Sequence, residues 1–382
     1  MHMVFITKLL WRDVMRYTRE DGCKAWLTYA QAKASVLCQI LEEFRSAENV
    51  YDQLLKDKGK ALKPYLSQAQ IDLLLEKAKP QPMHEMMLTM QRHQMGVIGI
   101  DAHNYPDSLR MIPDPPAILF YRGELDCLMG KCIAIVGTRK AAPNTIEATQ
   151  RIARDLSNAG VTVVSGLAMG IDSAAHQGCL EGTSPTVALL GCGIDIDYPS
   201  SNHNLKERIV ASGGLLLSEY PPGTPGMPWH FPVRNRMISG LCRAVVMMEA
   251  QIRSGTMTTV SHALDQGKDV YAYPGNIGSE WAEGAHQLLR EGASYFTSAE
   301  DILENLNWVN AKPVPTRQEK SSLPPMSDGQ RTIYSLLSQR EMSFDELANA
   351  TGFDAPGLSG ELTMLTILGL IRSLPGKTYG KV

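Results

Sequence analysis

The fold is decided by the stretch KCIAIVGTRK, residues 131–140, in the middle of the chain. Residues 132–136 are all apolar, and the turn Gly137-Thr138-Arg139 follows them directly. A short run that is apolar at every position is typical of a strand buried on both faces, as in parallel sheets. The stretch therefore predicts a buried strand whose carboxyl end carries a small, basic turn.

Five similar runs follow this one, and segments with helical patterns separate them. They lie at residues 161–164, 186–190, 215–217, 244–248 and 270–273. Strands that alternate with helices form a parallel sheet covered on both faces. We expect an α/β fold, an extended Rossmann-like doubly wound parallel sheet, with its ligand site at the carboxyl ends of the strands.

The regions on either side of this sheet differ in character. Residues 1–110 show Leu-, Met- and Ala-rich helical patterns, which predict a helical N-terminal domain before the sheet domain at 111–307. Prolines and scattered charges indicate a linker at 308–327. Residues 328–382 show three helical segments and then a strand, a turn and a strand, which is the order of a winged-helix domain.

Composition limits the classes of protein that remain. At about 150 residues per domain, a chain of 382 residues suggests two or three domains. The 37 Lys and Arg against 40 Asp and Glu leave a formal net charge of −3. Binding to nucleic acid must therefore come from a local basic surface. The seven cysteines form no C-x-x-C pair and no long apolar run occurs, which predicts a cytoplasmic protein with reduced thiols, no zinc site and no membrane span.

The common nucleotide-binding motifs do not match this sequence. The GKT at 376–378 lacks the upstream glycine of a P-loop, because position 371 is isoleucine. The turn at 137–139 is not G-x-G-x-x-G, and the strand at 161–164 ends in Ser-Gly where an acidic residue would hold a ribose. We therefore expect no NAD and no other bound cofactor.

Two turns of small residues open predicted helices, GLAMGID at 166–172 and RSGT at 253–256. Exposed N–H groups at a helix start can receive a phosphate, and the helix dipole favours it. Each turn alone is explained equally well by tight packing and capping, with Asp172 as an N-cap. Their convergence on one sheet edge favours a phosphate site, whereas His176, on the same helix face as Asp172, is interpreted as structural.

The stretch from Tyr220 to Met248 contains no Asp or Glu but several arginines and aromatic residues. Such a stretch suits an anionic strand whose bases can stack, and the alternative is an ordinary surface loop with a core tryptophan. The basic residues and aromatics are Trp229, His230, Phe231, Arg234, Arg236 and Arg243, and Arg139 and Lys140 would add charge to the same edge. We predict one pocket there, lined by Arg139, Arg234, Arg236, Gly166 and Gly255.

Carboxylates that follow the strands leave an enzymatic alternative open. These residues are Asp195, Asp197, Glu219 and Glu249. If they converged, they could hold Mg²⁺ for hydrolysis, but such residues more often serve as turn residues and caps.

Five motifs in order over roughly residues 105–300 resemble the DprA (Smf) family of DNA-processing proteins of natural transformation. They are IVGTR (135–139), VSGLAMGIDSAAH (164–176), FPVRNRMISGL (231–241), RSGT (253–256) and VYAYPG (270–275). Residues 328–382 are similar to the winged-helix domain that many members carry. The first 100 residues lack the Gly-rich helix-hairpin-helix signature of many members.

The resemblance implies a protein without catalytic activity that protects incoming single-stranded DNA and loads the RecA recombinase on it during natural transformation (competence). It also implies a homodimer formed through the Rossmann-like core. The residues that we expect to contact DNA are Gly137, Thr138, Arg139, Gly166, Gly170, Phe231, Arg234, Asn235, Arg236, Ser254, Gly255 and Thr256. None of them reads base edges in an obvious way, so binding should be largely independent of sequence, and no metal is expected.

Two other functions were weighed against this one. A phosphoribohydrolase of the lysine-decarboxylase-like group carries G-G-x-G-T-x-x-E, and here Thr259 stands where the catalytic glutamate belongs. A transcription regulator would use the winged helix, but residues 355–370 contain no Lys or Arg for a recognition helix. Both comparisons favour single-strand binding.

Overall fold

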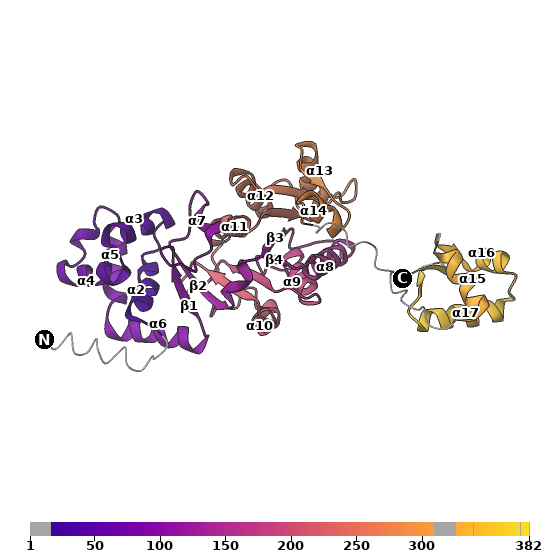
Figure 1. The fold of residues 1–382 in the computed structure, drawn as a ribbon, viewed down its shortest axis with the longest axis horizontal. Helices are drawn as coiled ribbons and strands as arrows, with labels where there is room; N and C mark the ends of the chain where they lie inside the picture. Colours follow the sequence, from indigo (N-terminus) through magenta and orange to yellow (C-terminus); the bar gives the residue numbers. More distant parts are fainter. Residues whose placement is uncertain (1–16, 309–325, 339, 375, 382) are drawn as a thin grey trace. The chain divides into compact units, whose positions relative to one another are not determined.

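The computed structural model describes residues 17–308, 326–338, 340–374 and 376–381. The chain divides into two compact units, residues 1–309 and 310–382 (Figure 1). Among the described residues, no helix combines the length and the apolar character needed to cross a bilayer. The predicted linker at 308–327 lies mostly outside the described residues.

The first unit is built around a nine-stranded sheet in the order β1-β2-β6-β5-β4-β3-β7-β8-β9. The strands are β1 (Gly96–Gly99), β2 (Ile118–Gly123), β3 (Lys131–Val136), β4 (Val161–Ser165), β5 (Thr186–Leu190), β6 (Leu215–Ser218), β7 (Ala244–Met247), β8 (Asp269–Ala272) and β9 (Ser294–Tyr295). Every pairing from β6 to β9 is parallel, which confirms the predicted sheet. The chain winds outward from β3 in both directions, so the strand order reverses between β3 and β7.

One edge of the sheet is antiparallel. Strand β2 pairs antiparallel with β6, and β1 pairs antiparallel with β2. Strand β1 lies inside the stretch 1–110, which was predicted to be helical, so that prediction is wrong at this point. Four residues, Gly96-Val97-Ile98-Gly99, are too few to show a strand period. The domain boundary at 110 stays a prediction.

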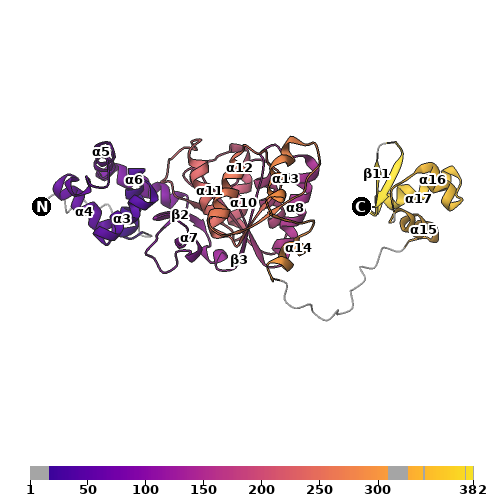
Figure 2. The ribbon, with the colours of Figure 1, turned by 90° about the horizontal axis from the view of Figure 1, so that it is seen from above.

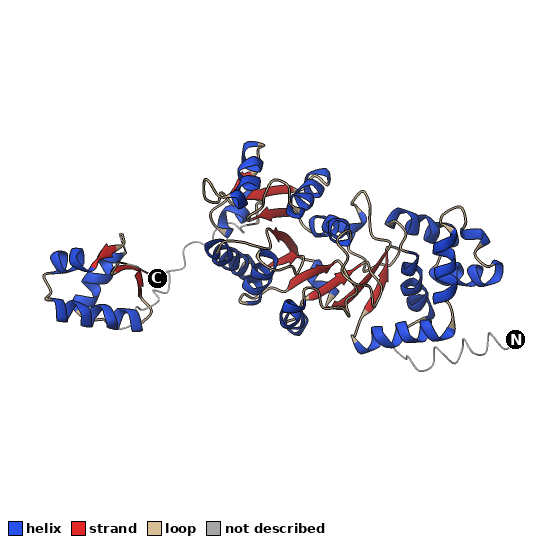
Figure 3. Cartoon of the chain, turned by 180° about the vertical axis from the view of Figure 1, so that it is seen from behind, coloured by secondary structure: helices blue, strands red, loops and turns tan. Residues whose placement is uncertain are grey.

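Helices cover both faces of the parallel strands (Figure 3). They are α7 (Asp107–Arg110), α8 (Pro143–Asn158), α9 (Ile171–Leu180), α10 (His203–Ala211), α11 (His230–Leu241), α12 (Gly255–Asp265), α13 (Glu283–Arg290) and α14 (Ala299–Asn305), with 3₁₀ turns at Leu125–Leu128, Ser200–Asn202 and Glu280–Ala282. Along β3, Ile133 and Ile135 pack with α8 and α9, and Ala134 and Val136 pack with α11 and α12. This alternation is the period of two expected of a strand buried on both faces.

The N-terminal helices gather at the β1–β2 edge (Figures 1 and 2). They are α2 (Arg19–Leu27), α3 (Ala34–Phe44), α4 (Ala47–Asp57), α5 (Gln68–Lys77) and α6 (Pro80–Arg92), with 3₁₀ turns at Thr28–Ala30 and Lys60–Leu62. Trp26 is fully buried at their centre, where its indole N–H donates to the Leu74 carbonyl at 2.9 Å and its ring meets Tyr51 edge-on at 5.0 Å. A buried Trp with a satisfied N–H contributes a large apolar area to the helix core.

The second unit is a winged-helix domain, as predicted. It contains α15 (Asp328–Leu337), β10 (Met342–Ser343), α16 (Phe344–Thr351), α17 (Ala355–Ile367), β11 (Ile371–Leu374) and β12 (Thr378–Lys381), with the strand order β10-β12-β11. Its core includes Ile333, Leu347, Leu358, Leu365 and Ile371, all buried. Reciprocal caps at Ser327 and Ser343 define where α15 and α16 begin.

Candidate nucleic-acid interface

A cleft opens where β3, β4 and β7 end, next to the point at which the strand order reverses. It consists of two adjoining hollows, the larger of about 320 Å³, that share Arg139, Ala168, Phe231 and Arg234 in their walls. We call it the arginine cleft. Its position at the switch point is where doubly wound sheets bind their ligands.

The turn that carries Arg139 is held rigidly from two sides. Glu249, just after β7, accepts hydrogen bonds from Thr138 N at its carbonyl (2.7 Å) and from Ala142 N at its carboxylate (3.0 Å). On the other side Gly170 has φ +78°, and a Cβ there would stand 2.4 Å from the Thr138 carbonyl. This close approach therefore requires glycine at position 170. The backbone that carries the Arg139 side chain is thus held in place from both sides.

Phe231 lies between two guanidinium groups. Its ring centroid is 5.6 Å from Cζ of Arg139 and 5.9 Å from Cζ of Arg234, both within cation–π range. Arg139 and its neighbour Lys140 are exposed, and in the described part of the chain neither has a carboxylate within ion-pair distance. The outer face of the cleft therefore presents uncompensated positive charge.

Arg234 is built into the sheet edge beneath Phe231 and is only 4% exposed. Its Nη1 donates to the carbonyl of Gly166, just after β4, at 2.8 Å and to that of Leu189, near the end of β5. Gly166 is necessary here, because a Cβ would lie 2.6 Å from the guanidinium. Burial lowers the pKa of Arg234, and the nearby Asp172 carboxylate opposes that shift.

The two helix starts at the cleft differ in charge. In α9 the first turn already contains Asp172, whose carboxylate accepts from Ala168 N at 3.3 Å and whose pKa burial raises. In α12 the first turn has no acidic residue, and the N-cap Ser254 makes no capping bond. The Ser254 hydroxyl is buried and has no hydrogen-bond partner among the described residues. Only α12 therefore presents an open site for an anion.

Most of the predicted site residues lie together. Those that line the arginine cleft are Gly137, Thr138, Arg139, Gly166, Phe231, Arg234, Asn235, Ser254, Gly255 and Thr256. Asn235 ties α11 to α12, since its amide donates to the Gly255 carbonyl at 3.1 Å. Gly170 lies behind the cleft, where it supports the Thr138 turn.

Arg236 lies on the other side of α11, so the prediction of one pocket for all three arginines is wrong for this residue. Its guanidinium forms two hydrogen bonds with Glu219 at 2.6 and 2.7 Å and one with Asp114 at 3.2 Å. Residues two positions apart on a helix point to different sides, which explains why Arg236 is separated from Arg234. Burial lowers the pKa of Arg236, but the two carboxylates outweigh this and raise it above its ordinary value.

The sequence patterns missed Tyr198 as part of the site. It lines the cleft, is 41% exposed, and its ring lies 5.1 Å from that of Phe231. Gly191 makes room for the same ring, since a Cβ there would be 2.8 Å from Phe231. The turn that holds Tyr198 was considered only for its aspartates, as possible metal ligands. The signal that points to Tyr198 is an aromatic residue in a polar turn.

The four carboxylates considered for a metal do not converge. Asp195 accepts from Gly223 N, Asp197 binds Lys206 and His203, Glu219 pairs with Arg236, and Glu249 holds the Thr138 turn. In the described residues no group of three His, Cys, Asp or Glu side chains is placed to hold a metal ion. Each carboxylate thus has a structural partner of its own.

His176 is a core histidine, as interpreted from the sequence. It is fully buried, and its Nδ1 lies 2.7 Å from the Thr186 hydroxyl. That hydroxyl donates to the Val163 carbonyl, so Nδ1 must carry the imidazole proton. Burial lowers the pKa of His176 to about 3, which keeps the ring neutral near pH 7.

Fold and site together define an α/β protein whose cationic cleft opens at the switch point of a doubly wound sheet. The family model for DNA recombination-mediator protein A matches residues 96–307, and that for the DprA winged helix domain matches residues 317–377. The chain belongs to this DprA (Smf) family.

Relatives and solved structures agree with this assignment. The chain is 42% identical over 199 residues to DNA processing protein DprA of Streptococcus pneumoniae (52% of this chain, 70% of that protein) and 35% identical over 288 residues to protein Smf of Escherichia coli (73% and 76%). The X-ray structure of the S. pneumoniae protein aligns with TM-score 0.54 and 34% identity (66% and 92% covered). DNA processing protein A of Helicobacter pylori, described for its single-stranded DNA binding mode, aligns with TM-score 0.51 and 29% identity (56% and 96%).

Proposed function

We propose that the protein binds single-stranded DNA through the arginine cleft, without sequence preference. The observation that carries the proposal is the exposed Arg139 guanidinium, which lies over Phe231 and has no carboxylate partner among the residues that the structure describes. A phosphate beside Arg139 would also reach the open start of α12 and the unpartnered Ser254 hydroxyl. Phe231 and Tyr198 supply faces on which bases stack whatever their identity.

The biological role in this proposal comes from the family and not from the cleft alone. It is the protection of incoming single strands in the cytoplasm and the loading of RecA on them during natural transformation, by a homodimer. The H. pylori relative is described as binding single-stranded DNA. The cationic cleft of this chain lies in the segment that the family model covers, which supports the transfer of that property.

The proposal includes no catalytic step. Hydrolysis in the related phosphoribohydrolase group depends on a glutamate, and the corresponding Thr259 is 2% exposed and uncharged. Metal-assisted hydrolysis needs carboxylates that converge on a cation, whereas those near the cleft each hold a different partner. Binding is therefore the favoured use of the site.

A gel-shift comparison of oligo-dT with a duplex of equal length tests the proposal. We expect the single strand to bind more tightly, because unpaired bases can stack on Phe231 while duplex bases cannot. Equal or tighter binding of the duplex would contradict it. In parallel, labelled DNA and nucleoside monophosphates are incubated with Mg²⁺ or Mn²⁺, and turnover that disappears in Glu219→Gln or Glu249→Gln would favour the hydrolase instead.

A further inference from the structure

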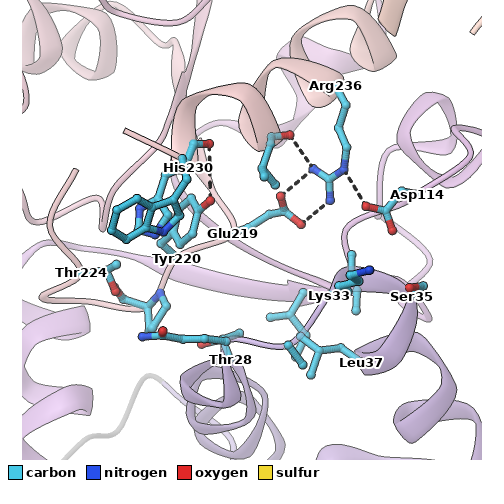
Figure 4. Close-up of a pocket in the computed structure, with 18 residues that line it drawn as sticks. Thr28, Lys33, Ser35, Leu37, Asp114, Glu219, Tyr220, Thr224, His230 and Arg236 are labelled. Atoms are coloured by element: carbon cyan, nitrogen blue, oxygen red, sulfur yellow. Dashed lines mark hydrogen bonds and ion pairs between the residues drawn. The ribbon is translucent and has the colours of Figure 1, made fainter. Parts of the chain in front are cut away.

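A second and larger cavity, of about 650 Å³, lies beside α11 on the side away from the arginine cleft. Its walls come from the start of α3 and from the segment that joins β6 to α11 (Figure 4). The volume lies in the range of about 300–1,000 Å³ that small-molecule sites occupy. We call it the α3/α11 cavity, and nothing in the proposed function uses it.

Helix α11 separates the two hollows, and its residues alternate between them. Val233 and Arg236 line the α3/α11 cavity, and Arg234 and Ile238 line the arginine cleft. The start of the helix divides in the same way, since the N-cap residue Trp229 lines the cavity and Phe231, in the first turn, lines the cleft. A strand that leaves the cleft across the start of α11 therefore meets the cavity next.

Trp229 offers an open aromatic face at this point. It is 62% exposed, an unusual state for a tryptophan in a folded chain. Its ring and that of His230 form an edge-to-face pair at 5.9 Å, and the His230 ring stacks with that of Tyr220 at 4.0 Å. Fixed neighbours lower the conformational entropy that an exposed ring loses when a base stacks on it.

The charges in the cavity favour a neutral base over a phosphate. The Arg236 guanidinium is shared by Glu219 and Asp114, so one cation faces two carboxylates (Figure 4). On this wall the two carboxylates would repel a phosphate, while carboxylate and guanidinium can both hydrogen-bond to a base edge. Lys33, on the opposite wall, is exposed and has no ion-pair partner among the described residues, so it can hold the phosphate that follows.

From these observations we infer that the α3/α11 cavity receives one unstacked base of the strand whose phosphates occupy the arginine cleft. The base stacks on Trp229, its edge faces the Glu219–Arg236 pair, and its phosphate lies near Lys33. The inference rests on the proposed function and adds a second contact that the sheet alone does not supply. It gives the N-terminal helices a part in strand binding, because Lys33 is the N-cap residue of α3.

Affinity measured over a ladder of oligo-dT lengths, from about 4 to 20 nucleotides, tests this inference. The full chain is compared with Trp229→Ala, Trp229→Phe, Lys33→Ala and Arg139→Ala by fluorescence anisotropy. We expect the wild-type affinity to rise about fivefold or more at the oligomer length that reaches the cavity. Trp229→Ala should remove this rise and leave the affinity for the shortest oligomers unchanged. Trp229→Phe should keep most of the rise in affinity. Lys33→Ala should reduce the rise, because it removes the phosphate contact on the other wall of the cavity.

Matched controls and contrary results separate this inference from the proposed function. Met129→Ala removes an 85% exposed apolar side chain, and Lys63→Ala an exposed lysine, and neither residue lines a cavity named here. Both should leave the ladder unchanged. If Arg139→Ala weakens every length but Trp229→Ala weakens none, or weakens all equally, the second contact is overturned and the cleft stands. If Arg139→Ala binds every length normally, both proposals fall.

Discussion

The two sides of α11 carry the same type of side chain in opposite electrical states. In the arginine cleft, Arg139 is exposed and has no carboxylate partner within the described part of the chain, and Arg234 is bound by backbone carbonyls. In the α3/α11 cavity, Arg236 is neutralised by Glu219 and Asp114. The difference teaches that an arginine in a basic-looking stretch contributes charge to a ligand only if the fold leaves it unpaired. The three arginines that were predicted to line one pocket thus have three different roles.

The largest effect that we expect is on stability. Arg236→Ala should lower the free energy of unfolding by about 3 kcal/mol or more, because it leaves the mostly buried Glu219 carboxylate, whose side chain is 14% exposed, without its partner. Urea unfolding followed by circular dichroism measures it. The matched control is Arg243→Ala, which breaks a pair with Asp269 at 2.8 Å whose side chains are about half exposed, and should cost about 1 kcal/mol or less. Equal losses in the two variants would contradict the role given to Arg236.

The next effect is on DNA affinity. Arg139→Ala should weaken binding of oligo-dT by about tenfold or more, the value of a hydrogen bond to a charged group, with unchanged unfolding. Arg151→Ala is the matched control, since it removes an exposed arginine of α8 that lines neither hollow. If both variants bind oligo-dT with the same affinity, the affinity depends on the net charge of the protein and not on the arginine cleft, which contradicts the prediction.

The smallest effect sharpens the comparison between the two helix starts. Ser254→Ala should weaken oligo-dT binding about fivefold, because the Ser254 hydroxyl has no partner in the part of the chain that the structure describes and can donate to a phosphate. The same change should leave the unfolding free energy of the free protein unchanged. Normal affinity in this variant would mean that α12 does not hold the phosphate.

The sheet could be predicted because its signal is local. Runs such as 132–136 are apolar at every position, and the turns after them carry the small residues that the cleft requires. Strand β1 could not be predicted, because its four residues begin and end with glycine and show no period, and its place beside β2 depends on pairing with another segment. Local pattern thus accounts for the parallel core and not for its antiparallel edge.

The site was predictable in position but not in pairing. The glycines at 166 and 255 and the residues Arg139, Phe231 and Arg234 could be placed at one edge, since all follow strands of one sheet. The partnership of Arg236 with Glu219 joins side chains that only the folded sheet brings together, and Tyr198 reaches Phe231 from a turn read for its aspartates. Tertiary contacts of this kind leave no mark on a single sequence.

The salt dependence of oligo-dT affinity tests the central claim, that the arginine cleft binds single strands through phosphates. The logarithm of the binding constant should fall with the logarithm of salt concentration with a slope of about −0.7 for each phosphate neutralised. The account predicts that Arg139→Ala makes this slope shallower by about 0.7, while Arg151→Ala leaves it unchanged. A wild-type affinity that does not respond to salt, or an Arg139→Ala slope equal to that of the wild type, would contradict it.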